Sequence, residues 1–279
     1  MANMVPIWWC VAPMQLKLTM QWPNYTPFLT VPMHLQTLFD LSDQTWPAAK
    51  TWSQGGWKFR LGQGGGQRAS ATSLVGPAFD GDITTAENTM RAMGQGALFL
   101  IRPDLNPAER RLDERLINLG YKFHDPVLAY GLDTNTPIHA LNSIATIQHW
   151  PLQAKHKVFW GAAGLTQGRL EVMARAKVAK TVLAVTSASE VLGLAFVTSY
   201  KGHAMLHALE VAPAHQRQGI GRAILRQAAG WAGDHGASSL NLLVTQANDN
   251  ARALYLSVGM AEITKYHYRK GNGPDIWIP

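Results

Sequence analysis

The segment that most constrains this chain runs from a strand into a helix, over residues 204–232. Residues 204–211 favour a strand, and from Ile220 onward apolar residues recur at helical spacing. Unpaired N–H groups at a helix start and the helix dipole favour an anion, and glycines let a phosphate approach the backbone. The turn between the two elements therefore predicts a phosphate site; it reads Gln216, Arg217, Gln218, Gly219, Ile220, Gly221, Arg222.

The flanking pattern adds further strands and a second helix. Two β-rich runs predict a hairpin, and a weakly periodic helix precedes them. A short strand and a second helix follow, and Gly259 ends this helix. The predicted elements are a helix near 166–177, strands at 180–186, 190–200 and 239–244, a helix at 248–258 and a strand at 260–269.

Two motifs together resemble the GNAT superfamily of acetyl-CoA-dependent N-acetyltransferases. The first contains Gln216, Gly219 and Gly221, and the second contains Asn250 and Tyr255 followed by a glycine. By themselves, the two glycines could simply permit a tight turn. The resemblance covers about 160–270, and it implies an α+β (mixed α/β) fold with a mostly antiparallel mixed sheet flanked by helices.

The resemblance implies a set of contacts to acetyl-CoA as cosubstrate. Backbone groups of Leu209 and Val211 would pair with the pantetheine arm, and Asn250 would lie near the pantetheine or the thioester. The pyrophosphate would bind the N–H groups of Arg217, Gln218, Gly219, Ile220, Gly221 and Arg222, in the motif that begins at Gln216. No metal is implied.

Two residues are candidates for the chemistry. Tyr255 matches the tyrosine that protonates the departing thiolate, although it could also be an aromatic core residue. The stretch from His207 to Val211 resembles that of serotonin N-acetyltransferase, a member of the superfamily, which implies that His207 is the general base. A structural polar residue is the alternative for His207. Strand alternation predicts that Glu210, the rival base, points away from His207.

The first half predicts the same order of elements as the second. It has helices at 84–94 and 107–119 and strands at 97–102 and 121–130. This order indicates a duplication, with a degenerate GNAT-like domain at 1–135 and a catalytic domain at 141–279. These would be two tandem domains, each with its own flanked sheet.

The first half lacks the residues that would bind and process the coenzyme. The segment before its first helix, 75–81, contains no Gln-x-x-Gly-x-Gly, and Asp80 and Asp82 would repel a pyrophosphate. Leu116 occupies the place of Tyr255. A separate Gly-rich segment, 61–68, lacks the Lys-Ser/Thr of a nucleotide-binding loop, so we expect a flexible hairpin loop between strand-like runs.

Composition narrows the remaining classes of protein. Lys and Arg number 25 and Asp and Glu 18, and the whole excess lies in residues 141–279, where a small polyanion site would explain it. No basic run indicates a nucleic-acid binder, and no apolar run is long enough to cross a membrane. The single cysteine, Cys10, excludes a disulfide framework and a paired-cysteine zinc site, and it fits a reducing cytoplasmic setting.

The sequence therefore predicts an N-acetyltransferase. The acetyl group would pass from acetyl-CoA to a primary amine of a small molecule or a peptide, by direct attack in a ternary complex. The alternative is a non-catalytic CoA-binding or sensing module. The acceptor and the oligomeric state are left open.

Overall fold

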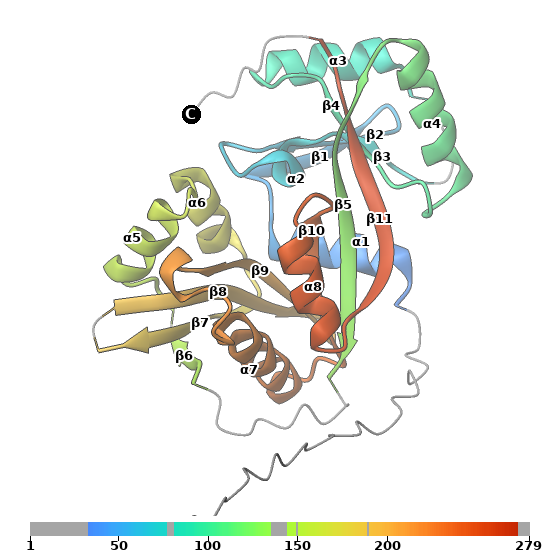
Figure 1. Cartoon of the computed structure of the whole chain (residues 1–279). Helices are drawn as coiled ribbons and strands as arrows, with labels where there is room; N and C mark the ends of the chain where they lie inside the picture. Colours follow the sequence, from blue (N-terminus) through green and yellow to red (C-terminus); the bar gives the residue numbers. More distant parts are fainter. Residues whose placement is uncertain (1–32, 77–80, 135–143, 149, 189, 273–279) are drawn as a thin grey trace, which may run out of the picture. The chain divides into compact units, whose positions relative to one another are not determined.

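The computed structural model describes residues 33–76, 81–134, 144–148, 150–188 and 190–272, all within one compact unit at 32–279. It contains an eight-stranded sheet of order β4-β11-β5-β10-β9-β8-β7-β6 and a three-stranded sheet of order β1-β2-β3 (Figure 1). Within the described part of the large sheet, only β9 and β10 pair in parallel. The mixed α+β class with mostly antiparallel sheets flanked by helices is confirmed.

The predicted elements of the first half follow one another in the predicted order. The elements of this half are α1 (Leu35–Thr45), β1 (Lys50–Gln54), β2 (Trp57–Leu61), α2 (Gln67–Ser70), β3 (Ser73–Leu74), α3 (Ile83–Ala92), β4 (Leu98–Ile101), α4 (Pro107–Asn118) and β5 (Lys122–Asp133). The structure thus adds α1, β1 and the short α2, which the sequence did not predict.

The second half repeats the strand–helix order with a longer sheet. Its elements are β6 (Thr146–Gln148), α5 (Ala154–Ala162), α6 (Gln167–Arg175), β7 (Ala179–Ser187), β8 (Glu190–Tyr200), β9 (His203–Val211), the short η1 (Pro213–His215), α7 (Ile220–Asp234), β10 (Ser239–Thr245), α8 (Asp249–Ser257) and β11 (Ala261–Lys270). The sequence did not predict α5.

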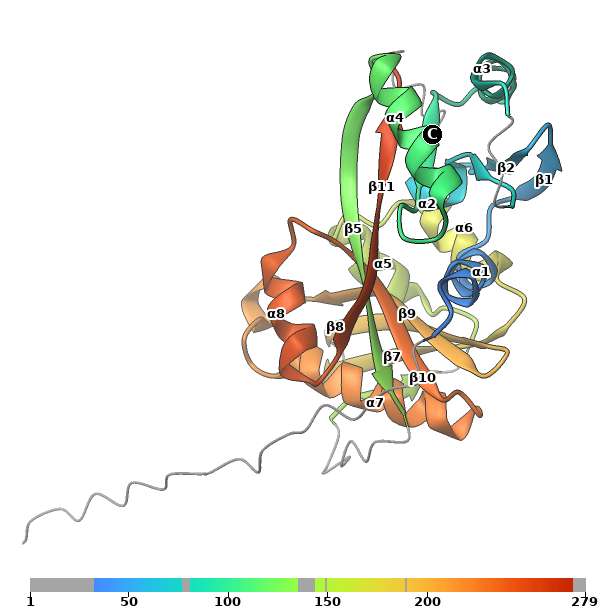
Figure 2. The ribbon, with the colours of Figure 1, turned by 90° about the vertical axis from the view of Figure 1, so that its right-hand side faces the viewer.

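The last strands of the two halves are exchanged. Strand β5 lies between β10 and β11 and pairs antiparallel with both, while β11 also pairs with β4. Figure 2 shows β5 and β11 as two long strands that run side by side from one half to the other. The large sheet is therefore shared by both halves. The domain ranges 1–135 and 141–279 stay a prediction, and the residues between them, 136–140, lie outside the described residues.

Strands β9 and β10 separate along their length. They pair from Ser239 opposite His203 to Leu242 opposite Leu206, and no pairing follows beyond that point of the described sheet. Helix α7 packs on one face of these strands, through Ile224 and Ala228. The opposite face of β8 and β9 packs against α5 and α6, where Trp160 is fully buried. The divergence opens a gap between two strands of one sheet.

A β-bulge at Ala208 reverses the expected alternation of β9. His207 lies opposite Phe196 and Glu210 lies opposite Leu194, so one residue of β8 faces two of β9. Ala208 has a φ of 48°, and its carbonyl accepts a 3.0 Å hydrogen bond from Trp160 Nε1.

This bulge corrects the predicted faces of β9. Leu194 and Phe196 belong to the same cluster beneath α5 and α6, so their partners Glu210 and His207 share that face. Leu209 and Val211 pack instead toward α7. The expectation that Glu210 points away from His207 is therefore wrong, because an extra residue in a strand moves every later side chain to the other face.

The Gly-rich segment 61–68 connects β2 with β3, which pair antiparallel, but it is packed rather than a simple hairpin loop. A Cβ on Gly168 of α6 would come 2.6 Å from the backbone of Gly64, so only glycine permits this approach. Trp46 Nε1 donates to the Gly65 carbonyl at 3.0 Å. The segment is thus fixed against α6 from the second half.

Candidate functional site

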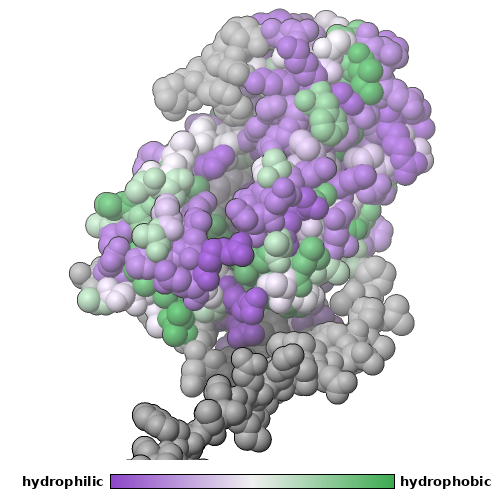
Figure 3. Space-filling model, viewed as in Figure 1, coloured by the Kyte–Doolittle hydropathy of each residue, from purple (hydrophilic) through white to green (hydrophobic). Residues whose placement is uncertain are grey.

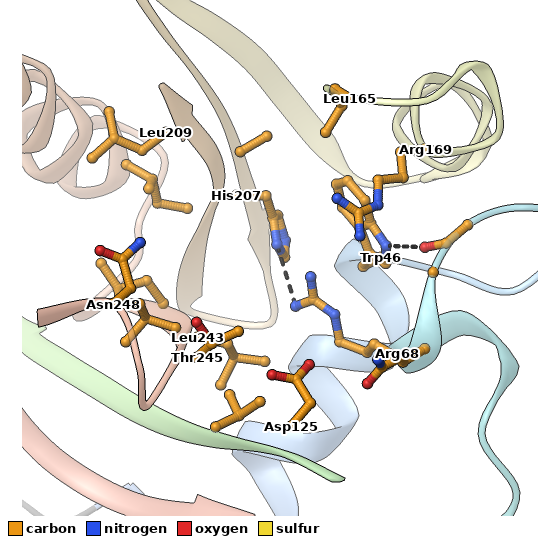
Figure 4. A pocket seen from close by; sticks show the side chains of 18 of the residues that line it. Trp46, Arg68, Asp125, Leu165, Arg169, His207, Leu209, Leu243, Thr245 and Asn248 are labelled. Atoms are coloured by element: carbon orange, nitrogen blue, oxygen red, sulfur yellow. Dashed lines mark hydrogen bonds between the residues drawn. The ribbon is translucent and has the colours of Figure 1, made fainter. Parts of the chain in front are cut away.

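A pocket opens where β9 and β10 separate, and both halves of the chain line it (Figure 4). The second half contributes Leu165, Arg169, residues 206–210 and 242–245, Asn248, Tyr255, Tyr266 and Tyr268. The first half contributes Trp46, residues 65–68, Asp125 and Val127. The Gly-rich segment is therefore a wall of this pocket, which its sequence alone did not indicate.

The start of α7 leaves backbone N–H groups unpaired close to the end of β9. Gly219 is the N-cap, with a φ of 84°, and no described side chain caps the helix. The N–H groups of Ile220, Gly221 and Arg222 have no partner within the helix, because a helix lacks acceptors for its first turn. This end of α7 can bind an anion.

The two glycines of this turn have different roles. A Cβ on Gly219 would meet no described atom within 4 Å, so the space in front of it is open. A Cβ on Gly221 would lie 2.9 Å from Leu254 Cδ2, so Gly221 allows α7 to pack closely on α8.

Polar side chains around this turn form hydrogen bonds within the protein. Gln216 Nε2 donates to the Val211 carbonyl at 3.3 Å, and Gln218 Nε2 donates to the Ala214 carbonyl at 3.2 Å. Arg222 reaches Ser257 Oγ on α8 at 3.3 Å. These contacts shape the turn and leave its backbone N–H groups available.

Asn248, rather than Asn250, lines the pocket. Asn248 is the N-cap of α8, and its side-chain oxygen accepts a 3.0 Å hydrogen bond from the Ala251 N–H. Asn250 lies exposed in the first turn of α8, outside the lining. The motif is therefore better matched two residues earlier, where an N-cap asparagine is favoured.

Tyr255 of α8 is buried against the pocket. It is 6% exposed, and its ring lies 5.9 Å from that of Tyr130 on β5. Burial first, and the charge of Glu210 second, raise the pKa of the Tyr255 phenol well above its ordinary value. Tyr255 thus keeps its proton throughout the neutral range.

His207 lies deep in the pocket wall, beside two residues that the sequence did not single out. Its ring centroid is 5.1 Å from that of Trp46, and its Nδ1 is 3.4 Å from Arg68 Nη1. Burial first, and the charge of Arg68 second, lower the pKa of His207 well below its ordinary value. His207 is therefore neutral, and its buried Nε2 has no partner among the described residues.

Glu210 lines the same pocket on the face that it shares with His207. Burial raises the pKa of Glu210, and the charge of Arg169 on α6 partly opposes this effect. Asp125 on β5 shows the same pattern: burial raises its pKa, while His124 and Arg169 lower it. The pocket therefore contains two carboxyl groups with weakened acidity.

The structure brings together part of the predicted set. His207, Leu209 and Tyr255 line the pocket, whereas Val211, Asn250 and residues 216–222 lie outside its lining. No group of three potential metal-ligating side chains occurs in the described part of the chain. None of the helices that the structure describes is long and apolar enough to cross a membrane.

Comparisons with known proteins find matches to part of the sequence and to the fold. A model of the acetyltransferase (GNAT) family matches residues 148–260. Streptothricin acetyltransferase of Streptomyces lavendulae is 36% identical over 84 residues, which are 29% of this chain and 44% of that protein. The matched stretch thus spans less than half the length of this relative.

Two solved structures share the fold over most of this chain. A GCN5-related N-acetyltransferase from Kribbella flavida superposes with a TM-score of 0.63 at 14% identity, covering 88% of this chain and 98% of that one. A tandem GNAT protein from the clavulanic acid biosynthesis pathway gives a TM-score of 0.50 at 13% identity, covering 68% of each chain.

Proposed function

We propose that this chain, whose residues 148–260 match the model of the GNAT acetyltransferase family, transfers the acetyl group of acetyl-CoA to a primary amine, by direct attack in a ternary complex. The observation that carries the proposal is the uncapped start of α7 beside a gap between β9 and β10. The acceptor is a small molecule or a peptide.

The residues present fit acetyl-CoA as cosubstrate. The N–H groups of residues 217–222 bind the pyrophosphate at the open face of Gly219. The backbone of Leu209 and Val211 pairs with the pantetheine arm, since no strand that the structure describes pairs with β9 on that side past Leu206. Asn248 replaces Asn250 as the residue beside the thioester.

We assign the proton acceptor to Glu210 and keep His207 as the rival. An attacking amine must lose a proton, and a carboxyl group with a raised pKa in the pocket suits this step. A histidine whose pKa is lowered well below its ordinary value is a weaker base, which argues against His207. His207 instead orients Arg68 through the contact at Nδ1.

Tyr255 donates the proton to the departing thiolate. The phenol is protonated at neutral pH because of its raised pKa, and it lies in the lining of the same pocket as Glu210. A module that only binds CoA would need neither a buried proton donor nor an acceptor facing one pocket, so the catalytic function is the better supported of the two.

The test is thiol release from acetyl-CoA with a panel of primary amines, together with calorimetric titration of CoA. Acetylation of an amine, verified by mass spectrometry, supports the proposal. Binding of CoA with no turnover on any amine would favour the sensing module instead.

The pH profile separates the two candidate bases. Below the pKa of the amine, log kcat/KM rises with pH at a slope of about one, because the amine must lose one proton. Below the pKa of a carboxylate base the slope increases to about two, because the base must lose a proton as well. We therefore expect Glu210→Gln to lower kcat/KM by about 10²- to 10⁴-fold and to remove that second proton from the acidic limb. His207→Gln should leave the acidic limb of the kcat/KM profile unchanged. If His207→Gln removes the limb and Glu210→Gln keeps it, His207 is the base.

A further inference from the structure

We infer that the acceptor carries a carboxylate and that Arg68 binds it, so that the substrate class is amino acids or amines with a similarly placed acid. This inference rests on the proposed function and specifies its acceptor. It starts from the charge of Arg68, which forms no ion pair with any carboxylate of the described residues.

Arg68, which is half-buried, differs from the three buried arginines of the described residues. Arg60 lies 2.9 Å from Asp43, Arg269 lies 2.6 Å from Asp113, and Arg102 pairs with Glu109. Within the described residues, Arg68 has no carboxylate at ion-pair distance. An uncompensated charge in a sheltered position is costly unless a ligand pairs with it.

The guanidinium of Arg68 is held in a defined position. It lies over the ring of Trp46 at 5.2 Å, and Trp46 is itself fixed by its hydrogen bond to the Gly65 carbonyl. Nη1 is 3.4 Å from Nδ1 of the neutral His207. Figure 4 shows Arg68 reaching from the Gly-rich segment toward His207, with Trp46 above it in this view. A fixed guanidinium presents a fork of N–H donors that matches a carboxylate.

The carboxyl groups that line the pocket do not neutralise the charge of Arg68. Neither Asp125 nor Glu210 forms an ion pair with it among the described residues, and the arginine whose charge acts on both is Arg169. The pocket thus offers a cation at Arg68 and an acidic group at Glu210. An acceptor with a carboxylate and an amine matches both charges.

The coenzyme phosphates are a poor alternative for Arg68. Arg68 contacts His207, whose face of β9 packs toward α5 and α6. The phosphate site at α7 lies with Leu209 and Val211 on the opposite face. Arg68 therefore belongs to the acceptor end of the pocket.

The test compares matched acceptors that differ only in the carboxylate: phenylalanine with phenylethylamine, and lysine with cadaverine. We expect Arg68→Gln to lower kcat/KM by about 10- to 100-fold for the acid members and to leave their partners unchanged. Arg68→Lys, which keeps the charge but loses the fork, should fall in between. Arg111→Gln is the control, because Arg111 is exposed on α4, at the largely hydrophilic end seen in Figure 3.

Equal losses for both members of each pair would overturn the inference and leave the acetyltransferase proposal intact. Binding is measured separately, by calorimetric titration of N-acetylphenylalanine and its amide into the CoA-saturated protein. Tighter binding of the acid that disappears in Arg68→Gln supports the inference even if no amine is acetylated, an outcome that would refute only the proposed function. Indifference to the carboxylate in this titration refutes the role of Arg68.

Discussion

Helices α3 and α7 hold corresponding places in the order of elements, because α3 lies between β3 and β4 and α7 lies between β9 and β10, but their N-termini differ. Asp82 caps α3, and its carboxylate accepts hydrogen bonds from the N–H groups of Thr84 at 3.0 Å and Thr85 at 3.2 Å. Gly219 leaves α7 uncapped. One helix start is thus satisfied by its own side chain, and the other is left for an external anion.

The same contrast extends to the second helix of each half. Asn106 caps α4 and Asn248 caps α8, so the turn before the helix is alike in both. Leu116 of α4 is fully buried in a hydrophobic cluster, whereas Tyr255 of α8 lies against the pocket. The halves share their elements and differ in a few side chains at the ends and faces of helices.

The largest expected effect tests the difference between Tyr255 and Leu116. Tyr255→Phe removes only the hydroxyl, so we expect kcat to fall by about 10²- to 10⁴-fold while the CoA affinity stays close to that of the wild type. Leu116→Met, a volume-conserving change in the corresponding helix, serves as the control and should leave kcat unchanged. A Tyr255→Phe enzyme with wild-type turnover in single-turnover measurements would remove the phenol from the mechanism.

A smaller effect is expected when the cap of α3 is copied onto α7. Gly219→Asp introduces a carboxylate at the anion site, and we expect CoA affinity in calorimetry to fall by about 10- to 100-fold. Gly219→Asn is the matched control, because asparagine has the same shape and tolerates a positive φ equally well but carries no charge. Equal affinities for CoA in the two variants would show that charge at this position is irrelevant.

The smallest effect concerns the cap of α3 itself. Asp82→Ala should lower the Tm by about 2 to 4 °C without changing CoA affinity, and Asp82→Asn should retain most of the stability. The hydrogen bonds from Thr85 and Thr84 lower the pKa of Asp82 in the folded state. Its stabilisation is therefore present above the ordinary pKa of aspartate and is lost as the pH falls through the lowered value. A Tm difference that persists in strong acid would contradict this origin.

The sequence predicted those features that depend on local periodicity and turn residues. The hairpin of β7 and β8, the strand–turn–helix of β9 and α7, and the order from α3 to β5 all follow from patterns within a few residues. The faces of β9 were predicted wrongly beyond Ala208, because a bulge held by Trp160 from α5 does not show in the alternation of the strand.

The acceptor end of the pocket could not be predicted in the same way. Trp46 and Arg68 meet His207 only through tertiary packing, from the opposite half of the chain. The glycines at 64–66 were visible in the sequence, but their partner on α6 was not. Close approach between distant segments is a property of the folded chain, and a single sequence carries no direct sign of it.

The exchanged strands also order events during synthesis. Strand β4 emerges early from the ribosome, but its neighbour in the large sheet, β11, is the last strand of the described chain to be made. β5 likewise waits for β10. Strands β4 and β5 of the first half cannot find these partners until the second half has been translated, so nascent chains expose unpaired strands for most of their synthesis. Such edges invite pairing between neighbouring chains, and chaperone demand should rise with translation time.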